Sequence, residues 1–144
     1  MADHAGKAVW NGDIKGSGTL STQSGTLNAP YSVGSRFEGK PGANPEELIG
    51  AAHAGCYTMY LTSVLTKHGH QVQSITTTST VTMNPNNGSP IIERIHVSTE
   101  GNVSGGNITA EDFQKHAEDA KTNCPVSRAL SAVPEITLDA KFVG

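Results

Sequence analysis

The chain has 144 residues, a length that suits one domain with one core. Only 35% of the residues are hydrophobic and 16 are glycine, so the core is lean and an oligomer that buries more apolar surface is expected. The formal net charge of −3 provides no positive field for a phosphate backbone, which argues against nucleic acid as a partner.

Membrane insertion and export are not expected either. No apolar run approaches the roughly 20 residues that cross a bilayer. The start, MADHAGKAVW, lacks the basic and then hydrophobic segments of a secretory signal. We therefore expect a cytoplasmic protein with no membrane partner. Because the cytosol keeps thiols reduced, Cys56 and Cys124 are interpreted as catalytic, redox-active or buried thiols rather than a permanent disulfide.

The first third of the chain predicts strands. Residues 7–14 alternate, with Ala8, Trp10 and Ile14 on one face. The glycines that follow predict a meander that ends near Val33. Residues 34–43, with the sequence GSRFEGKPGA, predict an irregular loop.

A long helix is predicted to follow this loop. Asn44 suits the N-cap, Pro45 the first helical position and Glu47 the capping-box position. The segment that follows is apolar on most sides, which is typical of a buried central helix. Basic residues and a glycine at 67–69 predict its end.

The second half of the chain predicts two more strands, two helices and a last strand. Residues 71–83 and 91–99 alternate and are joined by NPNNGSP, which predicts a hairpin. Thr109 suits the cap of an amphipathic helix, a short helix is predicted over residues 126–132, and EITLDAKFV predicts a strand. This order predicts a single α+β domain over residues 1–144, with antiparallel sheets packed on a long central helix.

Two cysteines are the candidate nucleophiles. Cys56 lies inside the apolar helix, where a free cysteine often only packs. Cys124 precedes Pro125 at a predicted helix N-cap, where the dipole and free N–H groups stabilise a thiolate. The local sequence does not decide which thiol attacks and which resolves. A disulfide between them requires Cα atoms within about 7 Å.

A reactive thiolate also needs a cation, and the cation needs an orienting group. Arg36 can contact a carboxylate and a thiolate together, and Glu46 has no other assigned role. The alternatives are an exposed loop arginine and an acid favoured by the first turn of a helix. Glu46 and Cys56 are ten residues apart, about 15 Å along a straight helix. Either the helix breaks near Gly50, or Arg36 moves, or a second subunit completes the site.

Histidines allow a metal-binding alternative. His53 lies three residues before Cys56 on the same helical face, so it could act as a base or bind zinc with Cys56 and Cys124. Structural polar contacts are the preferred interpretation of His53, His68 and His70. The motifs GxGxxG, P-loop, GxSxG and HExxH are absent from the sequence. A non-enzymatic redox switch is the other alternative.

Three segments carry a resemblance to a known family. RFEG from Arg36, NPEELIGAAHAGC from Asn44 to Cys56, and CPVS from Cys124 resemble the signature of OsmC/Ohr proteins. The opening AVWNGDIKGSGTLSTQSGTLN and the closing EITLDAKF are similar to the OsmC branch, the osmotically inducible proteins. The resemblance spans nearly the whole chain.

The resemblance implies a thiol-dependent peroxidase that reduces organic hydroperoxides to alcohols in oxidative and osmotic stress defence. Cys56 matches the peroxidatic cysteine and Cys124 the resolving one, which implies a Cys56 sulfenic acid and a Cys56–Cys124 disulfide. Arg36 matches the arginine that contacts the thiolate, and Glu46 the glutamate that pairs with it. The resemblance further implies an intertwined homodimer and no metal or organic cofactor. Because the Ohr branch is re-reduced by dihydrolipoyl groups on proteins, it implies a dithiol reductant of this kind.

Overall fold

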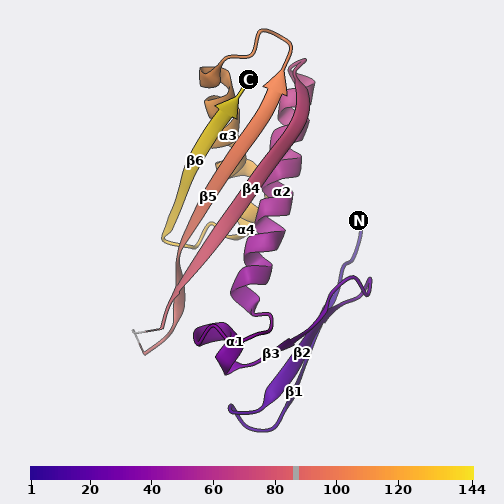
Figure 1. The fold of residues 1–144 in the computed structure, drawn as a ribbon, viewed down its shortest axis with the longest axis vertical. Helices are drawn as coiled ribbons and strands as arrows, with labels where there is room; N and C mark the ends of the chain where they lie inside the picture. Colours follow the sequence, from indigo (N-terminus) through magenta and orange to yellow (C-terminus); the bar gives the residue numbers. More distant parts are fainter. Residues whose placement is uncertain (86–87) are drawn as a thin grey trace. The chain divides into compact units, whose positions relative to one another are not determined.

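The computed structural model describes residues 1–85 and 88–144, and the chain divides into two compact units, residues 1–48 and 49–144. Within these described residues, ten elements follow one another (Figure 1). They are β1 (Gly6–Asn11), β2 (Ser17–Thr22), β3 (Asn28–Tyr31), α1 (Val33–Phe37), α2 (Pro45–Lys67), β4 (Gln71–Asn84), β5 (Ile91–Ser104), α3 (Ala110–Asn123), α4 (Pro125–Ala129) and β6 (Glu135–Val143). Among the described helices, none is both long and apolar enough to cross a membrane.

The first unit contains the predicted meander. β1, β2 and β3 form an antiparallel sheet in that order, and β3 ends at Tyr31, near the predicted position. The Trp10 and Tyr31 rings meet edge to face, with centroids 5.3 Å apart. A Cβ at Gly18 would lie 2.6 Å from the Tyr31 ring, so glycine leaves the space that this ring contact needs. β1 is shorter than predicted, because Gly12 has a φ of 93° and turns the chain.

The prediction of an irregular loop over residues 34–43 is partly wrong, because Val33–Phe37 forms the helix α1. Ser32 caps this helix: its Oγ accepts the Ser35 N–H at 3.0 Å, and Ser35 Oγ accepts the Ser32 N–H at 2.9 Å. This reciprocal cap satisfies two N–H groups that a short helix otherwise leaves exposed. Arg36 therefore lies in the last turn of a helix rather than in an open loop.

The long helix α2 is continuous from Pro45 to Lys67, close to the predicted bounds. Asn44 Oδ1 accepts the Glu47 N–H at 2.8 Å, which confirms the predicted N-cap. Burial is not uniform around the helix. Every fourth residue from His53 to Leu65 is buried, whereas Met59 is 77% exposed. The expectation of a helix buried on most sides is therefore not met within one chain.

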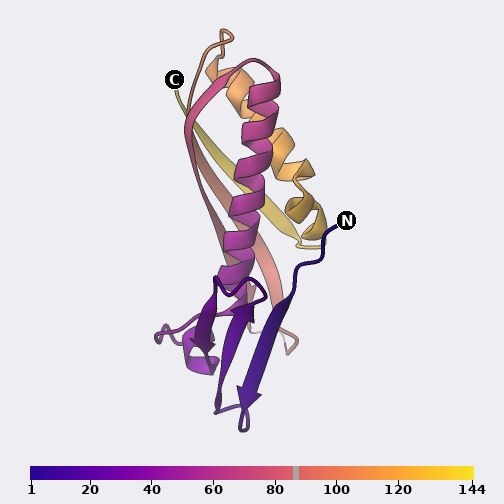
Figure 2. The same ribbon diagram turned by 90° about the vertical axis from the view of Figure 1, so that its right-hand side faces the viewer.

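The second unit builds a sheet of β4, β5 and β6 with α2 and α3 on one of its faces (Figures 1 and 2). β4 and β5 pair antiparallel over most of their length, which confirms the hairpin; the predicted turn at 84–90 lies partly outside the described residues. The prediction of purely antiparallel sheets is wrong, because β6 pairs parallel with β5. The helices α3 and α4 connect these strands, and such a crossover is what a parallel pair requires.

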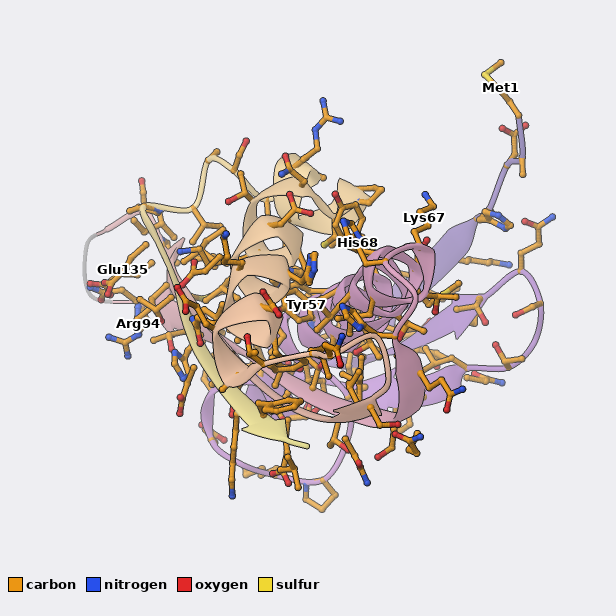
Figure 3. The ribbon with its side chains drawn as sticks, turned by 90° about the horizontal axis from the view of Figure 1, so that it is seen from above. Met1, Tyr57, Lys67, His68, Arg94 and Glu135 are labelled. Atoms are coloured by element: carbon orange, nitrogen blue, oxygen red, sulfur yellow. The ribbon has the colours of Figure 1, made fainter. Side chains whose placement is uncertain are left out.

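The core of the second unit lies between this sheet and the two helices. Tyr57 reaches from α2 to α3, where its hydroxyl donates to the Ala117 carbonyl at 2.8 Å (Figure 3). The Thr109 cap of α3 is confirmed, and the last short helix is Pro125–Ala129 rather than 126–132. The buried residues of the core come from both helices and the sheet: Tyr57, Leu61, Leu65, Ile95, Val97, Val103, Phe113, Ala120 and Cys124.

Gly50 allows α2 to approach the sheet closely. A Cβ at this position would lie 2.6 Å from the Ser79 carbonyl oxygen, and backbone cannot move aside as a flexible side chain can. We expect Gly50→Ala to lower the free energy of unfolding by about 1–3 kcal/mol, as overpacking does elsewhere. Urea unfolding followed by circular dichroism measures this change. An unchanged or higher urea midpoint would show that the helix can shift to make room for the methyl group without loss of stability.

Candidate active site

Cys56 and Cys124 are both free thiols, and in the second unit the Cys56 side chain packs against the core that contains Cys124. Cys56 also contributes to raising the pKa of Cys124, so the two side chains are near enough to interact. Cys56 projects from α2 and is partly exposed. Cys124 ends α3 and caps α4, and it is fully buried. The pair therefore combines one accessible sulfur with one sulfur that solvent does not reach.

The environment of Cys124 differs from the sequence-based expectation. It is the N-cap of α4, as predicted, and its Sγ accepts the Ser127 N–H at 3.4 Å. Burial nevertheless raises the pKa of the Cys124 thiol, and the hydrogen bonds between Cys124 and Ser127 offset this effect only in part. The N-cap alone does not make Cys124 a thiolate. Of the two sulfurs, Cys56 is the one an external molecule can approach.

Arg36 and Glu46 form a forked ion pair within the first unit. Arg36 Nη2 donates to Glu46 Oε1 at 2.6 Å, and Arg36 Nε lies 3.2 and 3.1 Å from the two carboxylate oxygens. The Glu46 side chain is only 12% exposed, so the carboxylate is held where water competes weakly. The geometry fixes the plane of the guanidinium and leaves Arg36 Nη1 outside the fork.

Because α2 is continuous, a break in this helix does not bring Glu46 close to Cys56. The helix does not break near Gly50, so these two residues stay ten positions apart on one regular helix. The ion pair belongs to the first unit and the thiols belong to the second. Two ways in which Arg36 could act on Cys56 remain: Arg36 moves, or a second subunit completes the site.

An apolar hollow of about 290 Å³ lies beside Arg36 in the first unit. Its walls are mostly aromatic and aliphatic: Trp10, Ile14, Tyr31, Val33 and Phe37, with Ser32 and Arg36. The Arg36 guanidinium lies 5.3 Å from the centre of the Phe37 ring. One cation in an apolar wall suits a molecule with a hydrocarbon body and a polar end.

Comparison with known proteins agrees with these features. The family model described as OsmC-like protein matches residues 37–139. Peroxiredoxin OsmC of Escherichia coli (strain K12) is 48% identical over 136 residues, which cover 93% of this chain and 92% of that protein. The chain belongs to the OsmC family. The uncharacterized protein YmaD of Bacillus subtilis is 29% identical over 97% of this chain and 95% of its own length.

Solved structures share the OsmC fold at lower identity. An OsmC-like protein of unknown function from Vibrio cholerae superposes with a TM-score of 0.77 at 18% identity, covering 97% of this chain and 99% of that one. An organic hydroperoxide resistance protein from Elizabethkingia anophelis gives a TM-score of 0.71 at 24% identity, over 99% of both chains. The α+β fold with a central helix is therefore that of the OsmC family.

In this OsmC-family chain His53 makes two polar contacts, as the sequence predicted. It is fully buried; its Nδ1 lies 2.8 Å from Ser79 Oγ and its Nε2 lies 2.8 Å from Ser127 Oγ. Burial lowers the pKa of this imidazole, which favours the neutral ring. His68 and His70 contact the carbonyls of Val64 and Gly105 at 2.9 Å.

Two residues of this network were not predicted. Ser79 lies 26 residues and Ser127 lies 74 residues from His53 along the chain, so no local spacing connects them. Both ring nitrogens of His53 face serine hydroxyls, which disfavours its use as a zinc ligand. Within residues 1–85 and 88–144, no group of three or more His, Cys, Asp or Glu side chains is placed to hold a metal ion.

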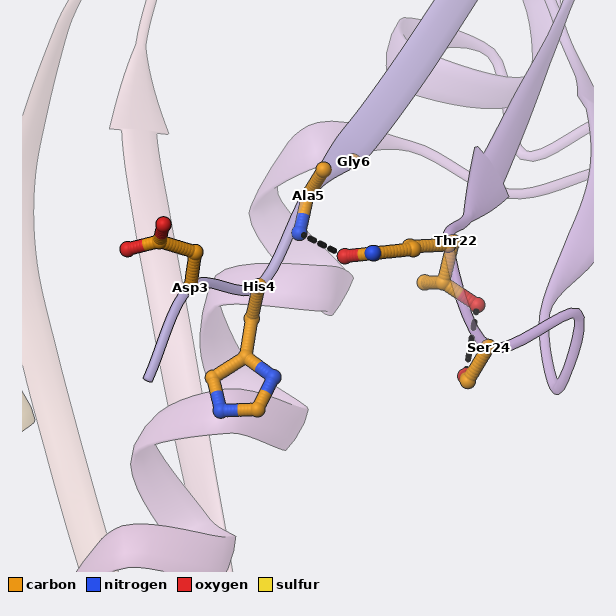
Figure 4. Close-up of a pocket in the computed structure, with 7 residues that line it drawn as sticks. Asp3, His4, Ala5, Gly6, Thr22 and Ser24 are labelled. Atoms are coloured by element: carbon orange, nitrogen blue, oxygen red, sulfur yellow. Dashed lines mark hydrogen bonds between the residues drawn. The ribbon is translucent and has the colours of Figure 1, made fainter. Parts of the chain in front are cut away.

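A second hollow in the first unit lies between the N-terminal segment and the end of β2 (Figure 4). Asp3, His4 and Thr22 are among its lining residues, and the Ala5 N–H donates to Gln23 Oε1 at 3.0 Å across it. None of the candidate catalytic residues lines this hollow. Its lining contains neither a cysteine nor an arginine, so we do not assign it to the reactive thiols.

Proposed function

We propose that this OsmC-family chain is a cysteine-based peroxidase that reduces organic hydroperoxides to alcohols. The observation that carries the proposal is the pair of free thiols, one accessible and one buried, with the accessible Cys56 packed against the core that contains Cys124. This arrangement suits a peroxidatic Cys56 and a resolving Cys124. The 48% identity to a protein named peroxiredoxin supports the same chemistry.

In the proposed reaction, the Cys56 thiolate attacks the distal oxygen of the hydroperoxide. The O–O bond breaks, the alkoxide takes up a proton and leaves as the alcohol, and Cys56 becomes a sulfenic acid. Cys124 then displaces the hydroxyl group from the Cys56 sulfur, forming a disulfide and water. An external dithiol reduces this disulfide and is itself oxidised. These steps need no metal or organic cofactor.

Arg36 and Glu46 have supporting roles in this proposal. Arg36 stabilises the Cys56 thiolate and the departing alkoxide, and Glu46 holds the guanidinium in its plane. Both residues lie in the first unit and both thiols in the second. Because these roles need residues of both units, we propose that residues 1–144 form one functional domain.

The apolar hollow beside Arg36 supports a preference for organic hydroperoxides over hydrogen peroxide. An alkyl chain gains from burial against aromatic walls, and hydrogen peroxide has none to bury. The proposed reductant is a dithiol, with lipoyl groups on a protein as the candidate. The proposed setting is defence against oxidative and osmotic stress in the cytoplasm.

The test is steady-state consumption of peroxide by the purified protein. We expect repeated turnover of tert-butyl hydroperoxide, faster than that of hydrogen peroxide, with dihydrolipoamide as a better donor than thioredoxin. A redox switch would oxidise once and stop. A single stoichiometric oxidation with every donor would therefore overturn the proposed enzymatic function.

We also propose a homodimer. One face of α2 is left exposed, and its residues are small or apolar: Ala52, Gly55, Met59, Ser63 and Thr66. Such a face allows two helices to approach closely, and we propose that the second subunit completes the site.

Light scattering should give about twice the 15.0 kDa chain mass. We expect Met59→Asp to weaken the dimer, and Lys67→Asp at the exposed end of α2 to serve as the control. A stable monomer that keeps full activity would contradict the dimer.

A further inference from the structure

A continuous line of hydrogen-bonding groups leads from Cys124 to β4 inside the second unit. Cys124 Sγ lies 2.9 Å from Ser127 Oγ, Ser127 Oγ lies 2.8 Å from His53 Nε2, and His53 Nδ1 lies 2.8 Å from Ser79 Oγ. Cys124, Ser127 and His53 are buried, whereas Ser79 is only partly buried. The line therefore runs from a buried thiol through a basic ring toward the edge of the core.

The donors and acceptors in this line can be arranged in two consistent ways. In the first, the Cys124 S–H donates to Ser127 Oγ, the Ser127 O–H donates to His53 Nε2, and the His53 Nδ1–H donates to Ser79 Oγ. In the second, a protonated His53 Nε2 donates to Ser127 Oγ, and the Ser127 O–H donates to a Cys124 thiolate. The second arrangement follows from the first when the Cys124 proton moves to Ser127 Oγ and the Ser127 proton moves to His53 Nε2.

We propose that His53, acting through the Ser127 hydroxyl, accepts the proton of Cys124 while the Cys56–Cys124 disulfide forms. The proposal rests on the proposed function, in which Cys124 resolves the Cys56 sulfenic acid. His53 is a positioning and proton-accepting residue in this step, because Ser127 separates it from the reacting sulfur. It takes no part in the attack of Cys56 on peroxide.

Disulfide formation replaces one S–O bond with one S–S bond. The Cys124 sulfur forms a bond to the Cys56 sulfur, and the S–O bond of the sulfenic acid breaks. The Cys124 proton passes to Ser127 while the Ser127 proton passes to His53 Nε2. The departing hydroxide takes a proton from water at the accessible Cys56 side, and His53 releases its Nδ1 proton by way of Ser79. The sum is one sulfenic acid and one thiol giving one disulfide and one water.

The surroundings explain why a base is needed at this thiol. Burial raises the pKa of Cys124 and lowers the pKa of His53, so the resting pair is a neutral thiol beside a neutral imidazole. The ring centroid of Tyr57, on the same helix, lies 6.5 Å from that of His53, and the two ring nitrogens meet Ser79 on β4 and Ser127 on α4. Cys124 lies one hydrogen bond beyond Ser127. A thiol held neutral reacts slowly unless its proton leaves as the new bond forms.

The test separates the two half-reactions in stopped-flow measurements on the full chain with one equivalent of tert-butyl hydroperoxide. The first phase, oxidation of Cys56, is followed by loss of peroxide, and the second by quenched mass analysis of the Cys56–Cys124 disulfide. In Ser127→Ala and His53→Gln we expect the first phase to keep its rate and the second to slow by about a hundredfold. Ser127→Thr, which keeps the hydroxyl, should recover most of the rate.

The pH profile distinguishes proton transfer from packing. In the wild type the second phase should depend weakly on pH near neutrality, because His53 removes the proton internally. In His53→Gln, which can still hydrogen-bond to Ser127, the rate should rise about tenfold per pH unit as free thiolate becomes available. His96→Gln is the matched control, since His96 Nδ1 also contacts a hydroxyl, Thr137 Oγ1 at 2.6 Å, in the same unit. Its second phase should be unchanged.

Different outcomes contradict the proton transfer to His53 and the proposed peroxidase function. A second phase of normal rate and normal pH profile in both Ser127→Ala and His53→Gln would overturn the proton transfer from Cys124 to His53, and would leave the peroxidase function in place. Equal slowing in His96→Gln would also overturn it, because a histidine outside the hydrogen-bonded line would then have the same effect. A wild type that consumes peroxide without forming the Cys56–Cys124 disulfide would overturn the resolving role of Cys124 first.

Discussion

Cys56→Ser is expected to abolish peroxide consumption, whereas Cys124→Ser should retain one fast oxidation and lose efficient turnover. A serine hydroxyl does not ionise near neutral pH and forms no sulfenic acid, so no residual peroxidase activity should remain. In Cys124→Ser, the partly exposed Cys56 still meets peroxide, but its sulfenic acid has no partner thiol. The turnover that depends on the disulfide should therefore fail.

Both variants can be followed by rapid mixing with one equivalent of an alkyl hydroperoxide and by intact mass. The wild type should lose two hydrogens as the disulfide forms, and Cys124→Ser should gain one oxygen. Cys124 is fully buried, so circular dichroism must show that Cys124→Ser is folded before its kinetics are compared. An active Cys56→Ser together with a Cys124→Ser that never reacts would reverse the two roles.

The sequence predicted those features that depend on neighbouring residues. Alternating side chains located the β4–β5 hairpin, and the caps at Asn44, Thr109 and Cys124 are in place. α1 was missed because Gly34 within it and Gly39 and Gly42 after it suggested a loop, although Ser32 and Ser35 carry a capping-box pattern. The parallel pairing of β6 was also missed, since strand periodicity does not report strand direction.

The site shows the same division between local and long-range information. The Arg36–Glu46 pair was hypothesised from residue chemistry, and the structure contains this contact. The burial of Cys124, which raises its pKa, comes from packing among α2, α3 and the sheet and has no local signature. Ser79 and Ser127 converge on His53 from distant segments, so only the fold reveals the line to Cys124.

The second large effect is expected at Arg36. If its guanidinium stabilises the Cys56 thiolate, Arg36→Ala removes that charge before the attack and also when the alkoxide leaves. Losing one charge-assisted contact in a partly desolvated site should slow oxidation of Cys56 by roughly two to three orders of magnitude. The measurement is the second-order rate constant of the reduced protein with an alkyl hydroperoxide, as a function of pH. The loss should be largest near neutral pH, where an unassisted thiol is mostly protonated.

Graded variants around Arg36 separate charge from geometry. Arg36→Lys should recover only part of the rate, because an ammonium cannot replace a fork that contacts Glu46 through Nε and Nη2 together. Glu46→Ala should act in the same direction as Arg36→Ala but more weakly, since the carboxylate orients the cation and does not touch sulfur. Glu47→Ala is the matched control: its side chain is exposed in the same helical turn, so the cost should be confined to helix stability, at about 0.3–1 kcal/mol. A normal rate and an unchanged pH profile in Arg36→Ala would make Arg36 a structural partner of Glu46, and the stabilisation of the thiolate would have to come from another group.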